Sequence, residues 1–567
     1  MNRISISLLL TAALCSAASA ERKATGGGVP ADWAPSTGKE MPVAKSPELD
    51  QAALEKALVK GLKLARAAKD KPGCNAALTL LYPSATRLQL AVGPKTAPVF
   101  EALAYCARKT KRFQVLEHVA RATAGTQVGR ASDLATALIG QDRRAEAAAE
   151  IKKGLAATPK DPFLLLAKAK LACVERDFTT CRDHAVLVLA TKSKDPELKS
   201  AHGMAHVSLW LSNLMLGDYA AARTAAAKMP APALRDGLVK IIVPAERAKL
   251  AVDYDASEQL ALGTYHLAGK VNPAPFELTF GNGDRKDREL RIEVEIPGVT
   301  SKTVKSVVVL GKRAEHVALT PTLLPTFAIA DVRAPQRVSL NVKVTENDKV
   351  VFERSVPTEL LPRDYLPTWH KTSADSKRPT LHNTGAWVTP NDPSIEQFLT
   401  KAKQRLVGRQ VFSGPQSETI PQVQAIYDEL KARGVSYVMD PGVTSDQFIG
   451  QRTRLPSEVL ASTNAQCLES TLLFATVLEA IGLTPIIVTV PGHAFVGWHA
   501  SPKDGPANPL FFVETTMVGT GAFQSAVKVA MNRVAQETKA GTFKTGASRL
   551  IEVKDLRAKG VTPQPAR

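Results

Sequence analysis

The stretch NAQCLESTLLFATVLEAIGLTPIIVTVPGHAFVGWH, residues 464–499, places a single cysteine directly before a long apolar helix pattern. Residues 468–481 have helical periodicity, and Gly482 is a typical signal for the end of a helix. Cys467 is therefore expected at a helix N-terminus, where unpaired backbone N–H groups and the helix dipole stabilise a thiolate.

Strand patterns follow this helix. The expected strands are residues 484–490, 493–498 and 510–516. His493 begins the second strand, and the carboxylate of Glu514 lies in the third. A cysteine or histidine among apolar residues is often only a core residue, so each would be weak evidence alone. Together, a helix-start cysteine, a strand histidine and a carboxylate on the next strand predict a thiol enzyme.

These residues resemble the transglutaminase-like superfamily of papain-like thiol enzymes. The sequence His493-Ala494-Phe495-Val496 stands where the family has His-Ala-Trp-Val, and Glu514-Thr515-Thr516 stands where it commonly has Asp-Pro-Thr. Upstream, residues 426–438 (IYDELKARGVSYV) are similar to the helix and tyrosine that precede the family's cysteine. The resemblance covers roughly 100 residues.

The resemblance implies the roles of three residues. Cys467 would be the nucleophile, His493 the base that takes its proton, and Glu514 the group that orients the imidazole. The backbone N–H of Cys467 would hold the oxyanion, helped by a side-chain donor for which Gln451 and Gln410 are candidates. Ala465, Phe495 and Glu514 depart from the family pattern, which leaves open a domain that has kept the fold and lost the activity.

The cysteines support a separate role for Cys467. Outside the predicted signal peptide the chain has five, an odd number, so one thiol should stay free in an oxidising compartment. Cys173 and Cys181 flank a predicted helix–helix turn and are expected to form a disulfide, and Cys74 and Cys106 allow a second. A zinc site would need a closer spacing such as C-x-x-C. No metal or cofactor is expected.

Residues 48–258 are rich in alanine and have helical periodicity throughout. Three stretches, 133–162, 163–196 and 201–230, each read as a helical hairpin closed by a proline. Their period of about 34 residues resembles that of the tetratricopeptide repeat. The resemblance implies an α-helical repeat solenoid that binds protein or peptide segments.

The remaining segments complete a multidomain α+β fold. Residues 259–365 alternate with period two and predict a small antiparallel β-sandwich resembling an immunoglobulin-like fold. Residues 366–385 are expected to be a linker, 386–555 the C-terminal α+β transglutaminase-like domain, and 556–567 a flexible tail.

The N-terminus predicts export. Arg3, a short apolar run and Ala18-Ser19-Ala20 are typical of a cleaved signal peptide over residues 1–20, followed by a flexible leader at 21–47. The apolar run is too short to span a bilayer, so no membrane span is expected. Composition and signal favour a Gram-negative bacterium, and with it a periplasmic or secreted protein.

The chain has 567 residues and a formal net charge of +19. Its Lys and Arg are spread evenly and form no aromatic-interleaved basic motif, so a nucleic-acid partner is not expected. The sequence predicts an exported thiol-dependent acyl-transfer enzyme, more a peptidase or amidase than a cross-linking transglutaminase, acting on a protein or peptide. The alternative is a non-catalytic envelope scaffold whose repeats bind proteins. The oligomeric state is left open.

Overall fold

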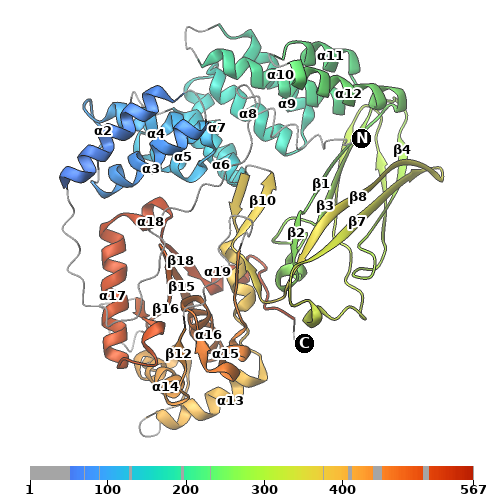
Figure 1. The fold of residues 1–567 in the computed structure, drawn as a ribbon. Helices are drawn as coiled ribbons and strands as arrows, with labels where there is room; N and C mark the ends of the chain where they lie inside the picture. Colours follow the sequence, from blue (N-terminus) through green and yellow to red (C-terminus); the bar gives the residue numbers. More distant parts are fainter. Residues whose placement is uncertain are drawn as a thin grey trace.

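The computed structural model describes residues 51–68, 71–88, 90–126, 130–192, 197–229, 232–373, 376–406, 411–438, 450–501 and 510–565. It shows a multidomain α+β protein with an N-terminal helical region, a central β-rich region and a C-terminal mixed α/β region (Figure 1). The predicted signal peptide and leader lie outside the described residues.

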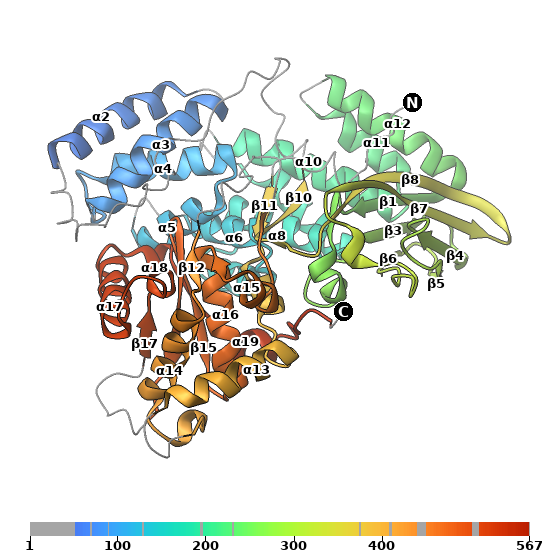
Figure 2. The same ribbon diagram turned by 60° about the horizontal axis from the view of Figure 1, so that its bottom comes forward.

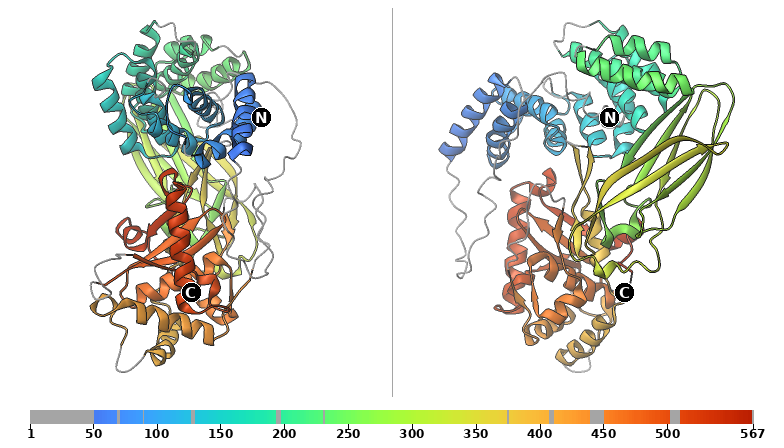
Figure 3. Two further views of the ribbon diagram at one scale, coloured as in Figure 1. Left: turned by 90° about the vertical axis from the view of Figure 1, so that its left-hand side faces the viewer. Right: turned by 45° about the vertical axis from the view of Figure 1, so that its right-hand side comes forward.

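The helical region is a curved layer of successive helix pairs that extends over both other regions (Figures 1 and 3). The described part of this region has the helices α2 (Gln51–Ala67), α3 (Lys71–Arg87), α4 (Ala97–Thr110), α5 (Phe113–Ala122), α6 (Ala131–Gly140), α7 (Arg144–Ala157), α8 (Pro162–Val174), α9 (Phe178–Ala190), α10 (Leu198–Met215), α11 (Tyr219–Ala227) and α12 (Pro232–Ala248). Aspartates cap several of them: Asp161 accepts from two backbone N–H groups of α8, and Asp218 accepts from one of α11.

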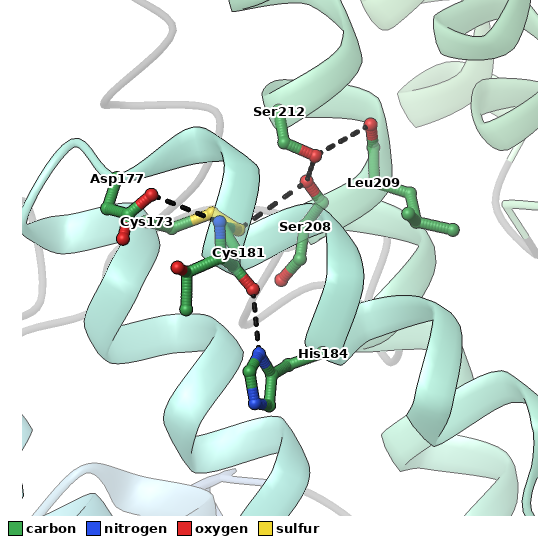
Figure 4. Close-up of a disulfide and its surroundings, with 8 residues drawn as sticks. Cys173, Asp177, Cys181, His184, Ser208, Leu209 and Ser212 are labelled. Carbon is green, nitrogen blue, oxygen red and sulfur yellow. Dashed lines mark hydrogen bonds between the residues drawn. A yellow bond between two sulfur atoms is a disulfide. The ribbon is translucent and has the colours of Figure 1, made fainter.

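The expected Cys173–Cys181 disulfide is present (Figure 4). The two Cα atoms are 5.1 Å apart, because the tight turn between α8 and α9 brings the helix ends together. Cys74 and Cys106 are fully buried, and their sulfur atoms lie 2.6 Å apart. The structure therefore brings together the second pair that the sequence suggested.

The central region has two sheets around one apolar core. Its strands are β1 (Leu250–Ala256), β2 (Gln259–Ala261), β3 (Phe276–Asn282), β4 (Arg288–Glu295), β5 (Thr303–Val309), β6 (Ala314–Leu319), β7 (Gln336–Glu346) and β8 (Lys349–Leu361). One sheet has the order β2-β8-β7-β4-β5, and the other β1-β3-β6.

Two features of this region differ from the expectation. β1 already begins at Leu250, inside the range predicted to be helical, because Leu250, Val252, Tyr254 and Ala256 all pack on the central apolar core, as every second residue of a strand does. The larger sheet is mixed rather than purely antiparallel, since β2 pairs with β8 in parallel. Both features depend on pairing with strands distant in the sequence.

The C-terminal region is built on a four-stranded antiparallel sheet with the order β17-β16-β15-β18. Its strands are β15 (Pro485–Val490), β16 (His493–His499), β17 (Leu510–Val513) and β18 (Arg549–Glu552). Helix α16 (Cys467–Ala480) covers one face, and α17 (Phe523–Lys539) the other (Figures 1 and 2). The apolar residues of the strands alternate between the two faces, so both helices bury an apolar side.

Smaller elements surround this sheet. They are β9 (Tyr365–Pro367), β10 (Trp369–Ser373), β11 (Ser376–Pro379), η4 (Leu381–Trp387), α13 (Pro393–Ala402), η5 (Lys403–Arg405), η6 (Gly414–Gln416), α14 (Thr419–Ala432), β12 (Ser436–Tyr437), β13 (Gly450–Arg452), α15 (Pro456–Ser462), β14 (Asn464–Ala465), η8 (Thr515–Met517), α18 (Thr542–Thr545) and α19 (Val553–Ala558).

Two segments expected to be unstructured are ordered. In the predicted linker at 366–385, the described residues contribute to β9, β10, β11 and η4, and β9 pairs with β13. The predicted tail at 556–567 continues α19, and its Val561 is fully buried. Gln564 donates its backbone N–H to Ala386 O, so the chain packs back onto η4. These contacts join segments far apart in sequence, which local composition does not indicate.

In the part of the chain that the structure describes, none of the helices has both the length and the apolar character needed to cross a bilayer.

Candidate active site

Cys467 is the first residue of α16 and is partly exposed, with a free thiol. The turn before it is held on both sides. β14 pairs in parallel with β12, so that Ala465 lies opposite Tyr437, and the Gln466 side chain donates to Arg452 O at 2.7 Å. Glu469, three residues into the helix, accepts from the Gln466 backbone N–H at 3.1 Å. The thiol therefore stands at a capped and fixed helix start, as the sequence predicted.

A buried ion pair supports this turn from behind. The Glu469 carboxylate is almost fully buried and accepts from Arg454 Nη2 at 2.7 Å and from Arg454 Nε at 3.0 Å. The same guanidinium donates to the side chain and the backbone oxygen of Asn464. Arg454 thus connects the helix start to the strand before it, which fixes the direction in which Cys467 leaves the turn.

His493 begins β16 directly after a tight turn with Gly492 at φ +74°. The positive φ suits glycine, and it lets His493 pair with Val490 at the end of the β15–β16 hairpin. His493 Nε2 lies 2.8 Å from Glu514 Oε2, and Cys467 lies near enough to the imidazole to raise its pKa. Because Glu514 occupies Nε2, Nδ1 is the nitrogen left to exchange a proton with the thiol.

Glu514 follows β17 and is buried, with 6% of its surface exposed. Its other oxygen, Oε1, accepts from the Thr516 hydroxyl at 2.6 Å and from the Thr516 backbone N–H at 3.1 Å. Burial raises the pKa of Glu514, but the hydrogen bond and charge of His493 and the bonds from Thr516 hold it below its usual value. The residue is therefore a carboxylate at neutral pH.

The pKa of His493 is shifted the other way. Burial lowers it, but the neighbouring Cys467 and the hydrogen bond and negative charge of Glu514 raise it to about 10. His493 is therefore charged at neutral pH, next to the Cys467 sulfur and the Glu514 carboxylate. The arrangement can activate a thiol nucleophile and later supply a proton to a leaving group.

The loop carrying Glu514 is attached to the helix carrying Cys467. Ser470 Oγ lies 3.0 Å from Thr515 Oγ1, and the hydroxyls of Ser470 and Thr471 both donate to Cys467 O. The three predicted site residues therefore come from the start of a helix, the start of a strand and the loop after β17, which ends at Val513, before the expected end at residue 516. Side-chain contacts hold these elements together.

The sequence suggested Gln451 and Gln410 as side-chain donors to an oxyanion. Gln451 lies in β13, where its amide donates to Thr453 Oγ1 at 3.4 Å, and no described contact joins it to the thiol. Gln410 lies outside the described residues.

Tyr437 is a site residue that the sequence did not identify as a donor. Its strand β12 contacts both β14, before Cys467, and η8, after Glu514. Burial and the negative charges of Cys467 and Glu514 raise the pKa of Tyr437, whose side chain is still 45% exposed. The sequence signal for Tyr437 was its place after a helix within residues 426–438.

Within the described ranges, no group of three or more His, Cys, Asp and Glu side chains is arranged to hold a metal ion. No protein-family profile matches this chain, and no curated protein is significantly similar to it.

Proposed function

We propose that the chain is an exported, thiol-dependent acyl-transfer enzyme, a peptidase or amidase rather than a cross-linking transglutaminase, with a transglutaminase-like C-terminal domain. The observation that carries this proposal is that His493 is bonded to the buried Glu514 carboxylate and has its pKa raised by the neighbouring Cys467. A structural cysteine and a core histidine would have no need of a buried carboxylate held by two further bonds from Thr516.

The reaction follows from this geometry. The Cys467 thiolate attacks the carbonyl carbon of an amide, and the carbonyl oxygen becomes an oxyanion near the α16 N-terminus. The C–N bond breaks as His493 gives its proton to the leaving amine, which leaves a thioester on Cys467. Water, or a second amine, then loses a proton to His493 and attacks the thioester, which releases the acyl group and restores the thiol.

Two groups are proposed to hold the oxyanion. The Cys467 backbone N–H lies in the first turn of α16, where it has no partner within the helix. Gln451 remains a candidate for the second donor, and Tyr437 joins it because it lies beside both Cys467 and Glu514.

The other regions would present the substrate. We propose that α2–α12 form a tetratricopeptide-like solenoid that holds a protein or peptide, and that the central sheets form an immunoglobulin-like spacer. The Cys173–Cys181 disulfide supports a periplasmic or secreted location, where such bonds persist.

The deciding experiment is covalent labelling of Cys467 by a thiol-directed activity probe near neutral pH. Wild-type protein should be labelled rapidly, Cys467→Ala not at all, and His493→Ala far more slowly. Cys74 and Cys106 are buried and serve as internal controls. Slow labelling of Cys467 that is unchanged in His493→Ala would contradict the enzyme proposal and favour the non-catalytic scaffold.

A further inference from the structure

The short strand β12 lies beside the candidate active site. It pairs in parallel with β14, so that Tyr437 lies opposite Ala465, two residues before Cys467. Neighbouring strands are about 4.8 Å apart, and two residues of chain span at most about 7 Å, so the Cα atoms of Tyr437 and Cys467 lie within about 12 Å of each other. The negative charges of Cys467 and Glu514 both act on the Tyr437 side chain. β12 is therefore close to the thiol and to the carboxylate of the site.

One edge of β12 is occupied by β14. Ser436 donates its backbone N–H to Thr463 O at 3.0 Å. Val438 donates in the same way to Ala465 O, also at 3.0 Å. The backbone groups of successive residues in a strand point to opposite edges, so the N–H and C=O of Tyr437 point away from β14. Tyr437 thus forms the outer edge of β12.

This outer edge is unpaired. In the described part of the chain, the sheet has the two strands β12 and β14, and neither the N–H nor the C=O of Tyr437 has a hydrogen-bond partner among the described residues. The segment η8 also contacts β12 but forms no hydrogen bond with it. Ser436, Tyr437 and Val438 are all exposed, Val438 with 47% of its surface. A backbone donor and a backbone acceptor therefore stand side by side on an accessible surface next to the thiol.

An extended peptide suits this edge. A peptide residue placed beside Tyr437 would accept from its N–H and donate to its C=O, which is how an added strand binds to the edge of a sheet. A second copy of the protein suits it less well, because a stable interface between folded proteins buries more than about 1,000 Å² and a two-residue strand offers far less. The short distance to Cys467 favours a peptide that also reaches the thiol.

We propose that β12 is a substrate-docking strand: the main chain of the peptide substrate pairs with Tyr437, and this pairing positions the reacting carbonyl at Cys467. The inference rests on the proposed function for the identity of the substrate as a peptide. Main-chain pairing does not depend on the identity of the side chains. The enzyme should therefore accept many sequences but require an extended segment on one side of the reacting bond.

Alkylating peptides with single N-methyl groups test this pairing. N-iodoacetyl-tetraalanine amide carries its chain beyond the leaving amine, and acetyl-tetraalanine chloromethyl ketone carries it on the acyl side. Each parent probe is compared with derivatives that are N-methylated at one alanine in turn, because a methylated amide cannot donate a hydrogen bond. The second-order rate of Cys467 alkylation is measured, and Cys467→Ala provides the blank.

In the wild type, one N-methyl position in one of the two series should lower the rate about tenfold. Methylation at the alanines on either side of it should have a much smaller effect, because their N–H groups point to the other edge of the peptide. The responsive series shows on which side of the reacting bond the substrate is held. This scan needs no variant of the protein.

Two variants test the partner group in the protein. Tyr437→Pro removes the backbone N–H, and the outer edge of a strand tolerates proline. Tyr437→Ala is the matched control, because it removes the ring but keeps the N–H. The responsive parent probe should react about fivefold more slowly with Tyr437→Pro than with Tyr437→Ala. Iodoacetamide, which has no peptide chain, should react equally with both variants.

A scan with no sensitive position in either series would overturn the proposal, as would equal rates of the parent probe with Tyr437→Pro and Tyr437→Ala. The absence of a sensitive position, together with a dimer that Tyr437→Pro abolishes, would show that a second copy occupies the edge. Alkylation requires a thiol but no turnover, so the two proposals fail separately. A sensitive position without amide cleavage refutes the proposed function and supports the docking strand, and amide cleavage without a sensitive position does the opposite.

Discussion

His493 Nε2 and Glu514 Oε2 are 2.8 Å apart, and this contact joins a strand-start histidine to a buried carboxylate that Thr516 holds from its other side. Together with Cys467, this contact raises the pKa of the imidazole despite its burial. The carboxylate therefore has a definite chemical task in the proposed reaction, which is to orient the ring and stabilise its charged form.

For activity, the charge of Glu514 should matter more than the length of its side chain. Glu514→Gln keeps the size but removes the charge that stabilises an imidazolium, and an analogous change in a serine-protease triad costs about 10⁴-fold in kcat. Glu514→Asp keeps the charge and should retain much more activity, measured as hydrolysis of a fluorogenic peptide amide. Equal losses in both variants would show that Glu514 has only a structural role. Thr516, or Asn508, which lies outside the described residues, would then be the candidate for orienting His493.

Thr516 should act as a positioning residue. Thr516→Val removes the hydroxyl that donates to Glu514 Oε1 at 2.6 Å, and a lost bond to a charged group corresponds to about a ten- to hundredfold decrease in kcat. Thr516→Ser restores the hydroxyl and should recover most of the rate with KM unchanged. Failure of the serine variant to recover activity would argue against this role.

The raised pKa of His493 predicts how stability depends on pH. Its contribution is fully present below the ordinary histidine pKa of about 6.5 and is lost as the pH rises through about 10. Urea unfolding should therefore show that His493→Gln destabilises the protein more at pH 6 than at pH 10.5. A difference in unfolding free energy that is the same at both pH values would contradict the raised pKa.

The Arg454–Glu469 pair should be needed for stability. Arg454→Met leaves the buried Glu469 carboxylate without its cation, which should cost about 3–5 kcal/mol of unfolding free energy. Arg452→Met is the matched control, because the Arg452 side chain is 66% exposed in its pair with Asp364 and should cost less than about 1 kcal/mol. Similar losses in urea titrations of both variants would show that the buried pair has no special role.

The mature protein should contain one reactive thiol. Cys74 and Cys106 have sulfur atoms 2.6 Å apart, and we expect them to form a disulfide in an oxidising compartment such as the periplasm. Thiol titration in denaturant without reductant should then find Cys467 alone, and peptide mapping should find both bridges. A bridge that includes Cys467 would rule out its role as the nucleophile.

Local patterns in the sequence were sufficient to predict the helix and the strands that carry the candidate site. The helix that begins at Cys467 and the strands around His493 and Glu514 follow from periodicity and turn residues within short windows. The Cys173–Cys181 bridge was predictable for the same reason, since a single turn separates the two residues.

The tertiary structure decided what depends on contacts between distant segments. It brings Tyr437 beside the thiol, places Arg454 under the helix start and packs the C-terminal segment around Val561 against η4. Periodicity shows which face of an element is buried, but the partner on that face is chosen by the free energy of packing the whole chain.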